Sequence, residues 1–134
     1  MNKEAVRPQA ASVAGPYSPG VRAGGFLFTS GQLPARPSGE LVADDMRAAT
    51  RQCLENVRGV LEAGGASLEA VVKVTVFLAD MADFAAMNEA YADFFPSPPP
   101  ARTCVQVAAL PKGARIEIEA VAVLGPAGQG TRRG

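Results

Sequence analysis

The chain of 134 residues has no histidine, no tryptophan and only two cysteines. Without histidine the protein lacks the commonest general base, which excludes metal sites and Ser or Cys nucleophile systems that depend on an imidazole. Cys53 and Cys104 form no CxxC motif, and two cysteines cannot make a structural zinc site unaided. Because Cys53 falls on a helix face expected to be buried, we expect two free thiols in a reducing cytoplasm rather than a disulfide.

Long apolar runs and an excess of one charge are also missing. Residues 1–14 lack the apolar core of a signal peptide, and no stretch of about 18 apolar residues could span a membrane. Thirteen basic residues balance thirteen acidic ones, which argues against a broad surface for nucleic acid or anionic lipid and leaves room only for a local patch. We expect a cytoplasmic protein with no membrane partner and no nucleic-acid partner.

The length fits one domain with one hydrophobic core, which we place at residues 1–124. Residues 1–14 are polar and small, and we expect them to be irregular. Residues 125–134 are rich in glycine and arginine, which predicts a disordered C-terminal tail.

Periodic patterns predict five strands and two helices in the order β-β-α-β-α-β-β. Strands are expected near Val21 and over 26–30, joined by a hairpin turn at Gly24-Gly25. Apolar residues at helical spacing predict a helix over 43–63, and its buried positions are Met46, Ala49, Cys53, Val57, Val60 and Leu61.

The second half of the chain begins with the clearest strand, residues 71–78. Its expected apolar face consists of Val72, Val74, Val76 and Leu78. Asp80, with Asp83 three residues later, resembles an acidic capping box that starts a helix running to about Phe95. The inward positions of this helix are Phe84, Met87, Tyr91 and Phe94 or Phe95. Pro96–Pro100 must be a loop, and two further strands follow.

Two amphipathic helices cannot cover both faces of so wide a sheet, so we expect them on one face in an α+β layer. The other face also carries apolar residues. A partner must cover it, which predicts an oligomer.

Arg102 and Glu117 stand on the last two predicted strands. A guanidinium can bind a substrate carboxylate through two parallel hydrogen bonds, and a carboxylate can orient or deprotonate a water. The pair therefore indicates a small-carboxylate site with hydrolytic chemistry. The alternative interpretation is an ordinary salt bridge between strands.

Several short motifs, each weak alone, follow one another from Gly15 to Val123. They are Gly15-Pro16-Tyr17, Thr29-Ser30-Gly31-Gln32, Asn56, residues 72–78, Asp83-Phe84, Asn88, Tyr91, Phe94-Phe95, Pro100-Ala101-Arg102, Cys104, Leu110-Pro111 and residues 116–120. In their joint order and spacing these motifs resemble the Rid family, also called YjgF. The chain is most similar to the RidA branch, which carries the arginine–cysteine pattern.

The resemblance implies a chorismate-mutase-like fold with a mixed β-sheet, in a homotrimer whose sheets form an inner barrel. It implies three sites between subunits, no metal and no organic cofactor. The implied reaction hydrolyses 2-imino acids, or their enamine tautomers, to 2-keto acids and ammonia. The substrate is a small 2-imino acid such as 2-iminobutanoate or 2-iminopropanoate.

The resemblance also implies site roles. Catalytic roles fall to Glu117, Arg102, Tyr17 and Cys104, and substrate-binding roles to Arg102, Ser30, Asn88 and Tyr17. Glu119 is a weaker candidate on the same strand face as Glu117. Each residue has a structural alternative: Tyr17 can fill a turn, Ser30 can form one, Asn88 can face solvent and Cys104 can be a small core residue.

Cys104 beside Arg102 also raises the hypothesis of a thiolate nucleophile. We reject this hypothesis because no histidine could act as the base and imine hydrolysis needs no covalent intermediate. We expect the main chain at Cys104 to contribute instead.

Two segments depart from the family pattern, Ser18-Pro19-Gly20 and Pro96–Pro100, and they leave substrate preference open. Other family members imply a second class of function: a carboxylate-binding or chaperone-like stress protein without turnover. A ribonuclease-like translation inhibitor is disfavoured by the absence of histidine and by the neutral charge.

Overall fold

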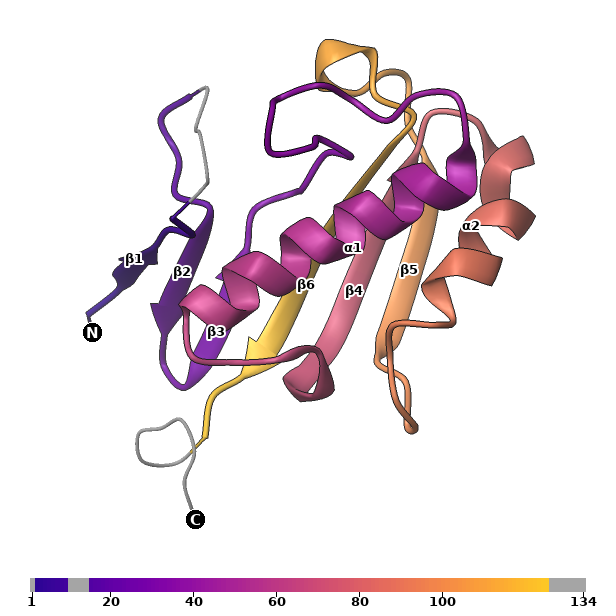
Figure 1. Ribbon diagram of the computed structural model, residues 1–134. Coiled ribbons are helices and arrows are strands. Elements are labelled where there is room, and N and C mark those ends of the chain that lie inside the picture. Colours follow the sequence, from indigo (N-terminus) through magenta and orange to yellow (C-terminus); the bar gives the residue numbers. More distant parts are fainter. Residues whose placement is uncertain (1, 10–14, 126–134) are drawn as a thin grey trace.

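The computed structural model describes residues 2–9 and 15–125. This part of the chain is α+β, with a six-stranded sheet and two α-helices (Figure 1). The strands are β1 (Glu4–Val6), β2 (Gly20–Ala23), β3 (Phe26–Thr29), β4 (Val71–Leu78), β5 (Ala101–Gln106) and β6 (Ile116–Val123). The helices are α1 (Met46–Ala63) and α2 (Phe84–Tyr91), and the short 3₁₀ turns are η1 (Leu68–Ala70), η2 (Met81–Asp83) and η3 (Pro111–Gly113). The predicted disordered tail falls almost wholly on residues 126–134, which lie outside the described residues.

The sheet has the strand order β1-β2-β3-β6-β4-β5, and the predicted mixed sheet is confirmed. Strands β4 and β5 are parallel, and the other neighbouring pairs are antiparallel. Strands β3 and β4 both run antiparallel to β6, which lies between them. Helix α1 connects β3 to β4 and so crosses over β6. Helix α2 makes the crossover between the parallel strands β4 and β5, and this places it beside β5.

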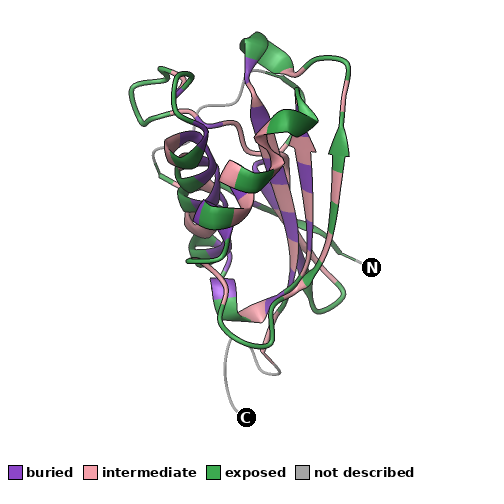
Figure 2. Ribbon diagram, turned by 90° about the vertical axis from the view of Figure 1, so that its right-hand side faces the viewer, coloured by how far each residue is buried: buried purple, intermediate pink, exposed green. Residues whose placement is uncertain are grey.

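Both helices lie on one face of the sheet, as predicted (Figure 2). All six predicted core positions of α1 are buried, and they pack with the alternate residues of β4 and β6. The β4 and β6 members of this core are Val71, Val74, Val76, Leu78, Ile116, Ile118, Ala120 and Ala122. In the described part of the chain, no helix has both the length and the apolarity needed to cross a bilayer.

The opposite face of the sheet is open and carries large apolar side chains. Phe26 and Phe28 flank the fully buried Leu27 on β3, and both are more than 40% exposed. Val105 and Val123 on β5 and β6 are also exposed. This open face, as we call it, is the uncovered apolar surface from which the sequence predicts an oligomer.

Four local predictions were wrong. Residues 4–6, expected to be irregular, form β1 on β2 and bury Val6. The first helix starts at Met46 rather than 43, because the Asp45 side chain caps it by accepting a hydrogen bond of 3.0 Å from the Arg47 N–H. A β-bulge between Val71 and Lys73 makes Val71 the buried residue and leaves Val72 43% exposed.

The fourth difference concerns the second helix. Asp80 does cap a turn, accepting from the Ala82 N–H at 2.9 Å, but this turn is the 3₁₀ element η2. The α-helix then runs only from Phe84 to Tyr91. After Tyr91 the chain tightens into turns in which the Asp93 N–H donates to the Ala90 carbonyl and the Phe94 N–H to the Tyr91 carbonyl, and Pro96 rules out a further helical turn. The predicted capping box is absent, since Asp83 binds a side chain from elsewhere in the fold.

Candidate active site

The Arg102 guanidinium lies between strand β5 and helix α2. Its Nη1 donates a hydrogen bond of 2.7 Å to Asn88 Oδ1. Its central carbon lies 4.8 Å from the ring centroid of Tyr91 and 5.5 Å from that of Phe84. The same Nη1 also lies 3.9 Å from Met87 Sδ, and because all four partners belong to α2, this helix determines where the guanidinium points.

Asn88 is therefore a direct partner of Arg102 and not merely a solvent-facing side chain. Phe84 and Tyr91 also contact the guanidinium, although the sequence identified them only as core residues. Burial raises the pKa of Tyr91 to about 12, against an opposing effect of Arg102, so the phenol is neutral at physiological pH. The helical spacing of apolar residues cannot distinguish an aromatic ring that contacts a guanidinium from a ring that only packs in the core.

Glu117 is the second residue of β6, and Gly31 lies directly against it. A Cβ atom at residue 31 would stand 2.6 Å from Glu117 Cδ and overlap the carboxylate. Partial burial, and secondarily the neighbouring charge of Glu119, raise the pKa of the Glu117 carboxyl. Such a carboxylate is a stronger base than an exposed one. Gly31 belongs to a motif that indicated the family, but the sequence assigned it no role.

Tyr17 and Ser30 lie at the same end of the sheet as Gly31. The Ser30 hydroxyl donates to the Ser18 carbonyl at 2.7 Å, and the Ser30 N–H donates to the Pro19 carbonyl at 2.8 Å. Ser30 thereby fixes the turn that follows Tyr17 and leaves the tyrosine ring half exposed. We call Tyr17, Ser18, Ser30, Gly31 and Glu117 the carboxylate half-site. In this order, each residue either follows the previous one in the chain or contacts it.

Arg102 and Glu117 lie on opposite faces of the sheet. Residues paired across strands point to the same face. Val76 pairs with both Cys104 and Ile118, which places Cys104, and Arg102 two residues before it, on the helix-covered face. Phe77 pairs with both Val105 and Glu117, which places Glu117 on the open face.

The two groups therefore do not form the salt bridge that was the alternative interpretation. In residues 2–9 and 15–125, the ion pairs involve neither Arg102 nor Glu117. Glu119 shares the open face with Glu117, as predicted, because it is two residues further along the same strand. One chain thus presents an unpaired guanidinium and an unpaired carboxylate on two different surfaces.

The two cysteines are both free, as predicted. Burial raises the pKa of the Cys104 thiol, while the Arg102 charge acts in the opposite direction. Burial also raises the pKa of Cys53 well above its usual range. Both residues are therefore protonated thiols near pH 7, which disfavours a thiolate nucleophile.

The main chain of β5 offers further polar groups. Strand β5 is at the edge of the sheet, and the Val107 N–H donates inward to the Leu78 carbonyl. By strand alternation, the main-chain groups of Arg102 and Cys104 point the other way, to the free edge. The carbonyl near Cys104 is therefore available to a ligand or a water.

The described residues also form a hollow that is lined by none of the candidate site residues. This hollow of about 460 Å³ lies between α1, η1 and the segment after α2, and Arg58, Leu68 and Phe94 are among its lining residues. The described residues contain no group of three or more His, Cys, Asp or Glu that could hold a metal ion.

Comparison with known proteins gives a consistent result. A family model described as endoribonuclease L-PSP matches residues 7–124. A RutC family protein of Pyrococcus horikoshii is 55% identical over 109 residues, covering 81% of this chain and 86% of the relative. The 2-iminobutanoate/2-iminopropanoate deaminase of Salmonella typhimurium is 46% identical over 126 residues, covering 92% of this chain and 98% of the relative. The crystal structure of Escherichia coli TdcF with bound serine superposes with a TM-score of 0.86 at 43% identity, covering 91% of this chain and 99% of that one.

Proposed function

The chain belongs to the endoribonuclease L-PSP family, which is the YjgF or Rid family, and from this premise we propose that it is an enamine/imine deaminase. In this reaction a 2-imino acid and water give a 2-keto acid and ammonia. The observation that supports the proposal is the pair of unpaired groups: a guanidinium suited to a carboxylate and a carboxylate suited to a water. Relatives named 2-iminobutanoate/2-iminopropanoate deaminase and a relative with bound serine, itself a small carboxylate, support the same substrate class.

We further propose that the active site forms between subunits of a homotrimer. Arg102 and Glu117 cannot meet within one chain, because they lie on opposite faces of the sheet. The open face carries exposed apolar side chains that another copy could bury, with the three sheets as an inner barrel. The carboxylate half-site of one subunit would then meet Arg102 and Asn88 of the next. We assign the assembly to the cytoplasm because both thiols are free.

The proposed roles follow from the contacts. Arg102, positioned by Asn88 and the rings of α2, binds the substrate carboxylate. Glu117 accepts a proton from the water that attacks C2 and passes it to the nitrogen of the carbinolamine. It then accepts the hydroxyl proton as the C–N bond breaks, which gives the keto acid and ammonia. Tyr17, whose ring is half exposed, forms a wall of the pocket. Positioning supplies most of the rate enhancement, because the imine carbon is already electrophilic.

A coupled assay tests the activity. A threonine dehydratase generates 2-iminobutanoate in situ, and ammonia release is followed with and without this protein. We expect clear acceleration by the wild type and little by Arg102→Ala. Sedimentation should give about three times the chain mass of 13.8 kDa. A fully active monomer would contradict the intersubunit site.

The main alternative is a carboxylate-binding protein without turnover. It would bind 2-oxobutanoate in calorimetry but leave imine decay unchanged. The exposed apolar residues of the open face favour a chaperone-like role only if they stay uncovered in solution. A ribonuclease role is disfavoured by the absence of histidine and by the balance of thirteen basic and thirteen acidic residues.

A further inference from the structure

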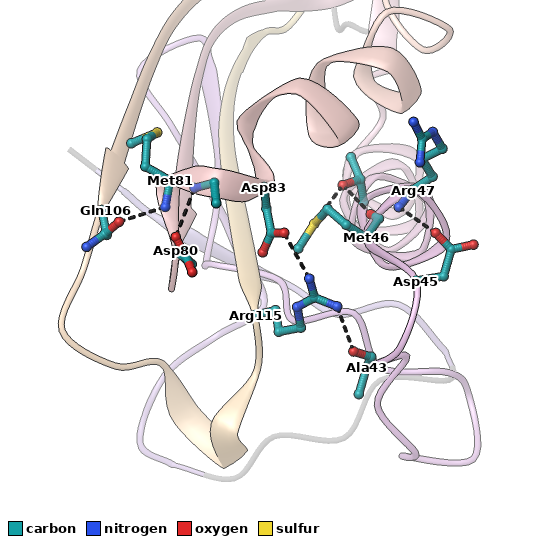
Figure 3. Close-up of polar contacts among 11 residues, drawn as sticks. Ala43, Asp45, Met46, Arg47, Asp80, Met81, Asp83, Gln106 and Arg115 are labelled. Atoms are coloured by element: carbon teal, nitrogen blue, oxygen red, sulfur yellow. Dashed lines mark hydrogen bonds and ion pairs between the residues drawn. The ribbon is translucent and has the colours of Figure 1, made fainter.

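Arg115, the residue immediately before β6, connects three segments of the chain (Figure 3). Its Nη2 bonds to Asp83 Oδ1 at 2.9 Å, and its Nη1 donates to the Ala43 carbonyl at 3.0 Å. Asp83 directly precedes α2, and Ala43 lies two residues before the cap of α1. One guanidinium therefore links the starts of both helices to the strand that carries Glu117.

The N-cap residue of α2, Asp83, makes a tertiary contact instead of a cap of its own helix, which follows directly on the Asp80-capped turn η2. Asp83 occupies the N-cap position, but its side chain makes no capping hydrogen bond to α2. Its carboxylate is only 19% exposed and is bound by Arg115 instead. An isolated helix of eight residues is not stable in water, so tertiary contacts must keep α2 in place.

Among the described residues, the side chains that hydrogen-bond to the Arg102 guanidinium or place a ring against it all belong to helix α2. Asn88 accepts its hydrogen bond, and Phe84 and Tyr91 lie against it. A shift of the first turn of α2 would move Phe84 first and then Asn88. The position of Arg102 is thus connected to Arg115 through a single short helix.

We propose that Arg115 is a positioning residue for substrate binding, which acts by fixing α2 and thereby aiming Arg102. The inference rests on the proposed function, because it takes Arg102 to bind the substrate carboxylate. Arg115 itself touches no reacting atom. Its loss should therefore weaken carboxylate binding and leave the water-activating chemistry of Glu117 largely intact.

The chain offers a matched control. Arg47 also connects α1 to α2, through a 2.7 Å ion pair with Glu89, the neighbour of Asn88. Both of these side chains are about half exposed, at 48% and 62%, whereas Asp83 is largely buried. Exposed pairs contribute little, so Arg47→Ala removes an arginine from the same helix pair without freeing the start of α2.

The experiment compares Arg115→Ala, Arg115→Lys and Arg47→Ala in the imine assay, with inhibition by 2-oxobutanoate and amide hydrogen exchange of residues 84–91 as further measurements. For Arg115→Ala we expect KM and the inhibition constant to rise about tenfold with kcat within about twofold, because the guanidinium binds the carboxylate in ground and transition states alike. Exchange in α2 should become about tenfold faster. Lysine should restore part of both effects, and Arg47→Ala should change neither.

Unchanged KM and unchanged α2 exchange in a folded Arg115→Ala variant would overturn the proposal. The proposal would also be overturned if kcat fell in proportion to the unfolded fraction while KM stayed constant, because that result indicates a purely structural role. If Arg115→Ala does not fold, Asp83→Asn removes the same ion pair and must show the same rise in KM and in exchange. If the wild type has no deaminase activity, the proposed function fails, while the exchange of α2 still tests the positioning by Arg115.

Discussion

Gly31→Ala should inactivate the protein without changing any titratable group. A Cβ at residue 31 would lie 2.6 Å from Cδ and 2.9 Å from Cγ of Glu117, where ordinary contact begins at 3.4 Å. The Cδ atom must therefore retreat by about 0.8 Å, and Oε2, which lies closer still, must move farther; a misplacement near 1 Å can cost about a hundredfold in rate. We expect kcat to fall by about that factor.

Stability should change little in this variant. The group displaced is the end of a flexible side chain, and the loss of a glycine stabilises by about 0.4–1 kcal/mol through the unfolded state. Gly59→Ala is the matched control, because Gly59 lies within α1 and an added Cβ would meet no atom within 4 Å. It should raise the melting temperature and leave kcat unchanged.

Two outcomes would refute the reasoning behind Gly31→Ala. Full kcat in a folded variant of wild-type mass would mean that the Glu117 carboxylate need not occupy its observed position. A loss of activity matched by loss of the folded state would mean that Gly31 serves the fold and not the site.

Further predictions concern the other site residues. Arg102→Ala should lower kcat/KM at least about a hundredfold, since a lost charge-pair hydrogen bond costs about 2–5 kcal/mol, and Arg102→Lys should recover only part because it lacks the planar fork; full activity of either variant would exclude the carboxylate assignment. Glu117→Gln should abolish turnover but keep 2-oxobutanoate binding in calorimetry. Because folding raises the pKa of Glu117 above 4.5, the folded state loses stability as pH rises through the raised pKa. The melting temperature of Glu117→Gln should therefore exceed that of the wild type at pH 7, and this difference should vanish below pH 4.5. Cys104→Ala and Cys104→Ser should keep most activity, and a substrate adduct trapped on Cys104 by mass spectrometry would contradict the water mechanism.

The elements with the strongest periodicity could be predicted from the sequence. Helix α1 has its apolar residues at regular helical spacing, and β6 alternates between Ile or Ala and Glu or Val, so packing and propensity favour one structure. Strand β1 could not be found in this way, because three residues carry no period and their pairing depends on β2. The length of α2 was overestimated because Phe94 and Phe95 continue the helical spacing although the chain has already left the helix.

The residue types of the candidate site could be chosen from the sequence, but their relative positions could not. The alternation along β6 shows that Glu117 and Glu119 share a face, yet it cannot show whether that face is the one Arg102 occupies on β5. That answer depends on the register of β5 and β6 with β4, which the structure shows through pairs such as those of Val76 and Phe77. The partners of Arg102 were missed for a similar reason, because Phe84 and Tyr91 have the spacing of core residues and become site residues only through the packing of α2 on β5.

The separation of Arg102 and Glu117 has a chemical consequence under the proposed mechanism. Within one chain the two groups cannot form an ion pair, because they lie on opposite faces of the sheet. On opposite faces, each group stays free, and each approaches the other only when a second copy covers the open face. The same contact removes water from the site, which strengthens the attraction of Arg102 for a substrate carboxylate, while the approaching guanidinium keeps Glu117 ionised and able to accept a proton. Burial of Phe26 and Phe28 would then stabilise the assembly and complete the catalytic site in one step, so a variant that weakens this apolar contact should lose trimer and activity together.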